Sequence, residues 1–386
     1  MLSAERSQFE LTDEQRQIGE LAAEIAQREI APHVARWDRE HAFPRELYGK
    51  LTEAGIMGIV VPEEYGGAGA DYISYALAIE EIARVDAGTA TTVSVHSMIC
   101  SALVRLGTEV QKRRWLPKLA TEDVIAGFAL TEPDAGSDAA SIRATARRTA
   151  GGYVLNGRKQ WCTNGSQAGV VMAMFRTGGR GAKGVSAFMV DASTAGIVVE
   201  KVTEKLGIHT SNTVDLAFDD AEIPADALLG EEGDGFGNAM KALTAGRIGI
   251  GAQATGILAA CLDESVRFAK ERAAFGRSIG AFEGVSFKIA QMATDLDAAR
   301  LLVYRAAALA DAGKPFAVEA SKAKLFASTA ARKHAAEALQ IHGGYGYTTE
   351  FPVERHYRDA KITEIYEGTS EIQQVIIARS LLGKLE

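Results

Sequence analysis

The order of segment types along the chain constrains the fold most, because it runs from helical to strand-rich and back to helical. Over residues 12–120 apolar residues recur at intervals typical of amphipathic helices. Residues 123–230 instead hold short β-branched and aromatic runs between turn residues, and the pattern after residue 235 is helical and alanine-rich. We therefore expect an α+β multidomain protein. Its expected parts are an N-terminal helical domain over residues 1–122, a middle antiparallel β-barrel or sandwich domain over residues 123–232, and a C-terminal four-helix bundle over residues 233–386.

Turn residues separate the strand-like runs of the middle region, and no long helix lies between them. An antiparallel arrangement is therefore more probable than a parallel sheet. Asn156-Gly157 is typical of a type I′ hairpin and predicts a turn between two strands. The predicted strands cover residues 153–155, 170–175, 185–190, 197–202 and 213–218.

Helix signals frame the two helical regions. Thr12 followed by Gln15 predicts a capping box at the first helix. The fragment Gly249-Ile-Gly-Ala-Gln-Ala254 matches a loose dinucleotide-binding pattern, but it lies within a helical segment, so we interpret its small residues as helix-packing positions. The glycine-rich stretch 178–184 lacks the ending of a phosphate-binding loop and reads as a hairpin tip. The long helices of the last region are predicted at residues 236–272, 284–312, 316–342 and 369–382.

Charge and composition exclude several classes of protein. The net charge of −8 argues against a nucleic-acid binder. The polar, acidic first twenty residues do not resemble a secretory signal or a transit peptide, and no apolar run approaches the length that spans a membrane. The three cysteines, Cys100, Cys162 and Cys261, have no metal-site spacing and are expected to be buried, reduced thiols. We therefore expect a cytoplasmic protein with no metal site and no membrane partner.

Four segments carry a more specific signal, and in this order they resemble the acyl-CoA dehydrogenase family, closest to its short-chain and short branched-chain members. The resemblance runs from about residue 9 to residue 382. It implies the three-domain fold of that family, FAD as cofactor and an acyl-CoA substrate. The segments are Phe128-Ala-Leu-Thr-Glu-Pro-Asp-Ala-Gly-Ser137, Trp161-Cys-Thr-Asn164, Glu271-Arg-Ala-Ala-Phe-Gly276, and the pair Gln340-Ile-His-Gly-Gly-Tyr-Gly346 and Ile365-Tyr-Glu-Gly-Thr-Ser-Glu-Ile-Gln373.

Glu367 matches the position of the catalytic base in the family. Taken alone, it would read as a solvated carboxylate before a glycine turn. Removal of the weakly acidic α-proton of a thioester requires a carboxylate in a dry pocket, where burial raises its pKa. Some relatives carry the base upstream, at the position of Gly246, so the resemblance assigns the role to Glu367. It also implies substrate contacts by Ser137, Thr244, Arg247 and Gly368.

The resemblance implies an oxyanion hole for the thioester oxygen, made by the main-chain N–H of the base and a flavin hydroxyl. It further implies a set of FAD contacts in which Thr131 bonds the flavin ring, Trp161 packs on it and Arg272 binds the pyrophosphate. The remaining expected FAD contacts are Phe128, Leu130, Gly136, Ser137, Thr163, Phe275, Glu283, Gln340, Gly343, Gly344, Thr369 and Glu371.

Two positions depart from the family pattern. Glu283 stands where many relatives have glutamine, and a carboxylate would repel a phosphate, so that contact is in doubt. Thr244 stands where short-chain members often carry aspartate, which leaves its contact to CoA in doubt.

The resemblance implies that Arg272 and the Gly343-Gly344 stretch reach the FAD of neighbouring subunits, so a homotetramer is expected. Electrons would pass to an electron-transfer flavoprotein. Two alternatives stay open: an acyl-CoA oxidase that uses oxygen, and a non-catalytic relative that only binds acyl-CoA or FAD. The length and branching of the acyl group stay open as well.

Overall fold

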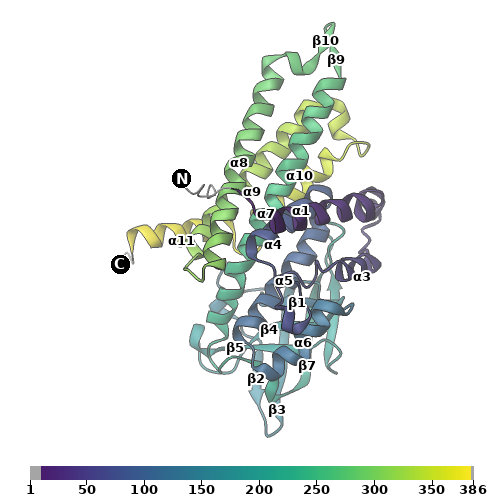
Figure 1. Cartoon of the computed structure of the whole chain (residues 1–386). Coiled ribbons are helices and arrows are strands. Elements are labelled where there is room, and N and C mark those ends of the chain that lie inside the picture. The colour runs from purple at the N-terminus through teal and green to yellow at the C-terminus, as the bar shows by residue number, and fades with distance from the viewer. Residues whose placement is uncertain (1–9, 384–386) are drawn as a thin grey trace, which may run out of the picture.

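The protein, here as a computed structural model describing residues 10–383, places a sheet at one end and long helices at the other (Figure 1). The N-terminal helices lie between the two. This is the predicted order of an N-terminal helical, a middle sheet and a C-terminal helical domain. The structure does not describe residues 1–9, which begin the first expected domain, or residues 384–386, which end the last one. The segment predicted to lack a signal sequence begins among these undescribed residues.

The N-terminal part begins with an amphipathic helix, in which the buried residues recur every three or four positions, at Gln15, Gly19, Ala22 and Ile25. The predicted capping box is confirmed: Thr12 accepts from the main chain of Gln15, and the Gln15 side chain accepts from Thr12 N–H at 2.9 Å. The fourth and fifth helices are almost completely buried. The helices are α1 (Asp13–Ile25), α2 (Val34–Glu40), α3 (Arg45–Glu53), α4 (Tyr72–Val85), α5 (Ala87–Leu106) and α6 (Glu109–Thr121), with a π-helical turn at Ala26–Ile30.

The middle part is one eight-stranded sheet in the order β6-β7-β3-β2-β4-β5-β8, with β1 paired to β4. Most neighbours are antiparallel, as expected, but β1 and β2 each pair with β4 in parallel. The strands β1, β2 and β8 were not predicted. The bounds are β1 (Ile125–Ala129), β2 (Thr145–Arg148), β3 (Gly152–Thr163), β4 (Ala168–Arg176), β5 (Val185–Asp191), β6 (Ile197–Val202), β7 (Thr213–Pro224) and β8 (Leu228–Leu229).

Both faces of the central strand β4 are covered, which explains its continuous apolar sequence. Val170 and Met172 belong to the core formed with helices α5 and α6. Val171 and Phe175, on the other face, pack with β3, β5 and β7. The sheet therefore connects the helical layer to a second core of its own.

The prediction of a hairpin turn at Asn156-Gly157 is wrong. Both residues lie inside β3, where the pairing with β7 shifts register between Leu155 and Gly157. Gly157 has φ 134°, and a Cβ there would approach the Cβ of Ala144 to 2.5 Å. The glycine thus serves a bulge and a close approach rather than a turn. Residues 178–184, by contrast, connect β4 to β5 as predicted.

The C-terminal part is built on three long helices that pack together, with α4 packed against two of them. The bounds of these three helices and of the last helix match the four predicted segments closely, whereas α10 was not predicted. Helix α11 packs on α9 and projects from the body (Figure 1). A short hairpin, β9 (Ala273–Ala274) and β10 (Arg277–Ser278), follows the first long helix. The helices are α7 (Gly235–Glu271), α8 (Glu283–Asp311), α9 (Ala317–His342), α10 (Val353–Ile362) and α11 (Ser370–Leu382).

The glycines of α7 are packing positions, as the sequence indicates. A Cβ at Gly249 would lie 2.2 Å from the Tyr75 hydroxyl, and one at Gly256 would lie 2.3 Å from the Glu80 carbonyl. Helix α4 can approach α7 closely only because these side chains are absent.

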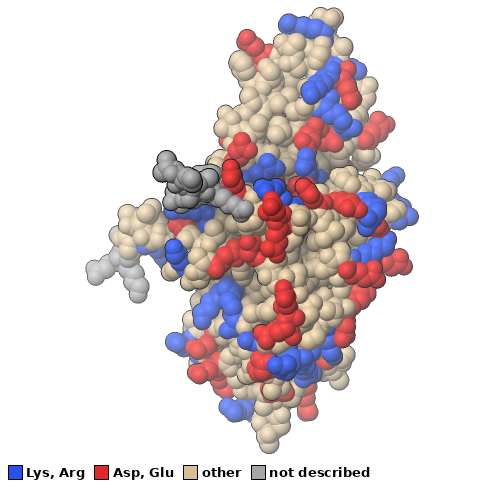
Figure 2. All heavy atoms as spheres, in the orientation of Figure 1, with Lys and Arg blue, Asp and Glu red and all other residues tan. Residues whose placement is uncertain are grey.

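Two helices, α5 and α7, are long and apolar enough to cross a membrane, which the sequence had not led us to expect. In both, 94% of the most apolar window is buried inside the fold. They are therefore core helices. Basic and acidic side chains are interspersed on the face shown in Figure 2. Cys100, Cys162 and Cys261 are free and buried, as expected.

We expect Gly256→Ala to lower the unfolding midpoint, because the added methyl meets the backbone of α4. Overpacking of this kind costs about 1–3 kcal/mol. Gly237→Ala, on the same helix with open space around its Cβ position, is the matched control and should leave stability unchanged or raise it by about 0.5–1 kcal/mol. Thermal unfolding of both variants followed by circular dichroism checks this, and equal midpoints would contradict it.

Candidate active site

Glu367 lies in the turn between α10 and α11 and has an unusual backbone conformation. Its φ is 52° and that of Gly368 is 93°. A left-handed conformation is uncommon outside glycine, and such positions concentrate at functional sites. The turn is held by Gln373, whose Nε2 donates to the carbonyls of Glu367 (3.3 Å) and Gly368 (2.8 Å). Lys324 Nζ donates to the same Gly368 carbonyl at 2.7 Å.

The Glu367 carboxylate is buried, and neither oxygen has a hydrogen-bond partner among residues 10–383. It points at Gly246 on α7, where an added Cβ would lie 2.1 Å from Oε2 and 2.9 Å from the sulfur of Met98. The missing side chain at position 246 therefore provides the space for the carboxylate. An unpaired buried carboxylate is costly, so this one is held in place by the surrounding fold.

The electrostatics of the site combine burial with two nearby cations. Burial raises the pKa of Glu367 to about 7, while Lys324 and Arg247 act in the opposite direction. Burial also lowers the pKa of Lys324 to about 8. Arg247 is 5% exposed, its Nε has no partner in the described chain, and burial lowers its pKa as well. A carboxyl group with a pKa near neutrality can both accept and release a proton.

A buried polar network fixes the residue next to Glu367. The Tyr366 hydroxyl donates to the side-chain oxygen of Gln253. Gln253 in turn donates to the carbonyl of Ala87 and the hydroxyl of Thr91, both at 2.7 Å. Because each member is satisfied, the network orients Tyr366 and hence the turn that carries Glu367.

A narrow cavity, too small in this structure to admit a water molecule, lies between α4, α5 and α7. Its wall includes Met98 and Ala245, which adjoin Gly246 and Glu367. At its other side the hydroxyls of Tyr72 and Ser101 lie 2.8 Å apart. The complete lining is Val60, Tyr72, Tyr75, Ser97, Met98, Ser101 and Ala245.

The candidate residues of the middle domain lie at the ends of β1 and β3. Phe128 belongs to β1, and Leu130 and the half-buried Thr131 follow it. The Thr131 carbonyl accepts from Gln160 N–H at 2.8 Å, which places this segment beside β3. Thr163 ends β3.

Trp161 is 54% exposed and has φ 57°. A large exposed aromatic in a left-handed conformation is available for contact with another molecule.

Further candidates lie on two other segments. Gly136 and Ser137 are exposed in the loop after β1. Thr244 lies on α7, where its hydroxyl donates to the Met240 carbonyl at 2.7 Å.

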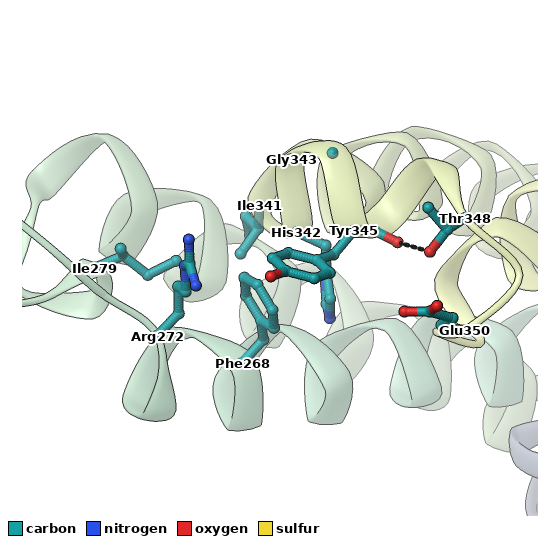
Figure 3. Close-up of a pocket in the computed structure, with 10 residues that line it drawn as sticks. Phe268, Arg272, Ile279, Ile341, His342, Gly343, Tyr345, Thr348 and Glu350 are labelled. Carbon is teal, nitrogen blue, oxygen red and sulfur yellow. Dashed lines mark hydrogen bonds between the residues drawn. The ribbon is translucent and has the colours of Figure 1, made fainter.

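A second group of candidates lies far from Glu367, around a pocket of about 510 Å³ at the other end of α7 (Figure 3). At about 1.5 Å of rise per residue, Arg272 lies roughly 37 Å beyond Arg247 along this helix. The Arg272 guanidinium lies 5.4 Å from the centre of the Tyr345 ring. Gly343 and Gly344 line the pocket, and neither would meet an atom of the described chain if it carried a Cβ.

The other distal candidates are exposed. Phe275 is 95% exposed and has φ 52°, and Glu283 begins α8. Gln340 lies on the exposed side of α9. Thr369 and Glu371 are not distal, because they follow Glu367 closely: the half-buried Thr369 caps α11, and Glu371 is in its exposed first turn, where a hydrogen bond from Thr369 lowers the pKa of Glu371. Within residues 10–383 no cluster of ligands suits a metal ion.

Comparison with known proteins decides the family. The models of the acyl-CoA dehydrogenase N-terminal, middle and C-terminal domains match residues 12–123, 127–221 and 233–382. The chain belongs to the acyl-CoA dehydrogenase family. Members of this family are flavin-dependent oxidoreductases.

Individual members of the family match over nearly the whole chain. An acyl-CoA dehydrogenase of Bacillus subtilis is 49% identical over 97% of this chain and 99% of its own. The mitochondrial short-chain specific acyl-CoA dehydrogenase of Mus musculus is 45% identical over 97% of this chain and 91% of its own.

Solved structures agree. Butyryl-CoA dehydrogenase from Megasphaera elsdenii has a TM-score of 0.96 and 43% identity, covering 97% of this chain and all of that one. A chain in a structure described as the electron transferring flavoprotein of Acidaminococcus fermentans has a TM-score of 0.97 and 44% identity, covering 98% of this chain and all of that one.

The structure adds residues that the family motifs had not indicated. Besides Lys324 and Gln253, a buried ion pair joins Lys159 to Glu132 at 2.7 Å. Glu132 also accepts from the main chain of Arg143 and Ala144, so it fixes the loop that follows Thr131.

The raised pKa of Glu367 has a consequence for stability. A carboxyl group whose pKa is higher in the folded than in the unfolded state destabilises the folded protein at any pH where it must ionise. For Glu367 this loss of folding free energy is absent below about pH 4.5 and complete above about pH 7. We therefore expect Glu367→Gln to stabilise the protein by on the order of 3 kcal/mol at pH 8 and by little at pH 4.5. Unfolding midpoints of the wild type and the variant across this range measure the effect, and a pH-independent difference would contradict it.

Proposed function

We propose that this protein oxidises an acyl-CoA thioester to the trans-2-enoyl-CoA, with Glu367 as the base that removes the α-proton. The observation that supports this most directly is the buried, unpartnered carboxylate of Glu367 beside a narrow cavity. Its pKa near 7 suits a base that must be ionised before reaction and protonated after it. FAD, when bound, supplies the acceptor for the hydride that leaves the β-carbon.

The negative charge that develops on the thioester oxygen requires donors. The main-chain N–H of Glu367 has no acceptor among the described residues, so it is free to donate to this oxygen. Gly368 and its positive φ let the main chain approach the substrate. Arg247 contributes a buried positive charge near Glu367. We propose that Ser137 and Thr244 contact the CoA portion, as expected from the family motifs.

The residues present fit FAD. Trp161 offers an exposed ring, and Thr131 lies beside β3 because its carbonyl accepts from Gln160 N–H. We propose that these two residues contact the flavin together with Phe128, Leu130, Gly136, Ser137 and Thr163. In the distal pocket the forked donors of Arg272 suit a pyrophosphate, and Gly343 and Gly344 leave room for it. We propose that Phe275, Glu283, Gln340, Thr369 and Glu371 complete these contacts.

The separation of the two groups favours an oligomer. Because roughly 37 Å of helix lies between Arg247 and Arg272, we propose that the distal pocket of one chain holds the FAD of a neighbouring chain. A homotetramer satisfies this requirement. Free, buried thiols suit a reducing compartment, and we propose that the protein acts in the cytoplasm.

We expect Glu367→Gln to retain the yellow flavin and to lose turnover by roughly 10³-fold or more, because the amide cannot accept the proton. The matched control is Glu364→Gln, which removes a carboxylate three residues earlier that pairs with Arg332 and Lys361 instead. Steady-state rates with butyryl-CoA and an artificial electron acceptor measure both. A Glu367→Gln variant that still turns over would place the base elsewhere.

The electron acceptor distinguishes a dehydrogenase from an oxidase. We propose an electron-transfer flavoprotein as the partner, supported by the likeness to a chain in the Acidaminococcus fermentans structure. After anaerobic reduction by substrate, the flavin should reoxidise slowly in air and rapidly with such a flavoprotein. Fast formation of hydrogen peroxide in stopped-flow measurements would instead indicate an acyl-CoA oxidase.

We propose a short acyl group, which would widen the narrow cavity beside Met98 as it binds and end at the Tyr72–Ser101 pair. Tyr72→Ala should open this end and raise kcat/KM for octanoyl-CoA relative to butyryl-CoA by about tenfold or more. Tyr72→Phe keeps the ring and should leave the ratio unchanged. A panel of straight and branched CoA esters measures it, and an unchanged ratio in Tyr72→Ala would place the acyl chain elsewhere.

A further inference from the structure

Lys324 on α9 is a buried charge that the proposed mechanism has not yet used. Its side chain is 0% exposed, and its ammonium group donates to the carbonyl of Gly368 at 2.7 Å. Lysine is rarely fully buried unless it is paired. The charge of the Glu367 carboxylate raises the lysine pKa against the effect of burial.

The Gly368 carbonyl receives two donors, Lys324 Nζ and Gln373 Nε2. This carbonyl belongs to the residue that follows Glu367, in a turn where both φ angles are positive. Two hydrogen bonds to one oxygen fix the direction of that peptide plane. That plane lies directly after Glu367, and a third bond, from Gln373 Nε2 to the Glu367 carbonyl at 3.3 Å, ties the preceding plane to the same side chain. Together these bonds hold the turn that carries Glu367.

We propose that Lys324 is a positioning residue for Glu367, holding the Glu367–Gly368 turn through the Gly368 carbonyl and supplying a positive charge that favours the ionised carboxylate. The inference rests on the proposed role of Glu367 as base. Lys324 itself does not contact the substrate, so its removal should change kcat far more than KM.

The charged surroundings of the pair set the sign of the expected effect. Lys324 and Arg247 lower the pKa of Glu367, whereas burial raises it, with about 7 as the result. Glu364 and Glu371 face Lys324, and the two tyrosines near the carboxylate, Tyr75 and Tyr366, are neutral because burial raises their pKa. Removing the lysine leaves Arg247 as the single cation among residues 10–383 that acts on Glu367, so the carboxyl pKa must rise.

Lys205 provides a matched control. It is a half-buried lysine whose ammonium group donates to the Ser211 carbonyl at 2.9 Å, and burial lowers its pKa to about 8, as for Lys324. It lies beside Asp359 rather than Glu367. Lys205→Met therefore removes a comparable buried ammonium and carbonyl hydrogen bond without changing the charge around the proposed base.

The experiment measures the titration of Glu367 directly and in catalysis. The carboxyl stretch is followed by infrared spectroscopy of the FAD-loaded protein over pH, and it is assigned by its loss in Glu367→Gln. The acid limb of kcat/KM for butyryl-CoA is measured in parallel. In Lys324→Met both midpoints should move to higher pH by roughly one unit or more, and kcat at pH 7 should fall at least tenfold. In Lys205→Met neither midpoint should move.

An unchanged Glu367 midpoint in folded Lys324→Met would overturn the proposal. If that variant does not fold, Lys324→Gln, which keeps a donor but not the charge, is judged by the same criterion. Failure of the proposed function has a different signature: the infrared midpoint moves, but the acid limb of kcat/KM does not follow it. That result would show that Lys324 sets the titration of Glu367 but that Glu367 is not the catalytic base.

Discussion

The site depends on a carboxylate that the fold holds out of water without a hydrogen-bond partner. Such a group is destabilising, so the surrounding structure must offset the free energy of burying it. It does so by the packing of α4, α5 and α7 around Gly246 and by the two donors that fix the Gly368 carbonyl. Burial therefore has two effects. It destabilises the ionised carboxylate, and it raises the pKa of Glu367 to about 7, which suits the role of base that we propose for it.

The three domains contribute to this arrangement in different ways. The long helix α7 carries Gly246 and Arg247 in its first third, and its glycines allow α4 and α5 to approach. The sheet presents Thr131 and Trp161 at the ends of two strands, supported by the buried Lys159–Glu132 pair. The distal end of α7 carries Arg272 to a pocket for which we propose the FAD of a neighbouring chain. A long rigid helix thus links one site to the cofactor contacts proposed for its neighbour.

Local rules predicted much of the fold. The capping box at Thr12 and the four long C-terminal segments were found because caps and apolar periodicity are properties of short stretches of sequence. Asn156-Gly157 shows where such rules fail. The same dipeptide that favours a hairpin also suits a bulge, and the pairing of β3 with β7, more than 50 residues away, decided between them. Strands β1, β2 and β8 escaped notice because they are short and gain their stability from partners distant in sequence.

The sequence by itself determined the family, the order of the domains and the residue types at the candidate site, since motif identity needs no coordinates. Only the tertiary structure decided that the Glu367 oxygens lack partners, that Gly246 makes room for them, and that Lys324 reaches the Gly368 carbonyl from 44 residues away. The physical reason is that burial, pKa and orientation are properties of a residue's surroundings. Those surroundings come from helices α4, α5, α7 and α9, which meet only when the chain has folded.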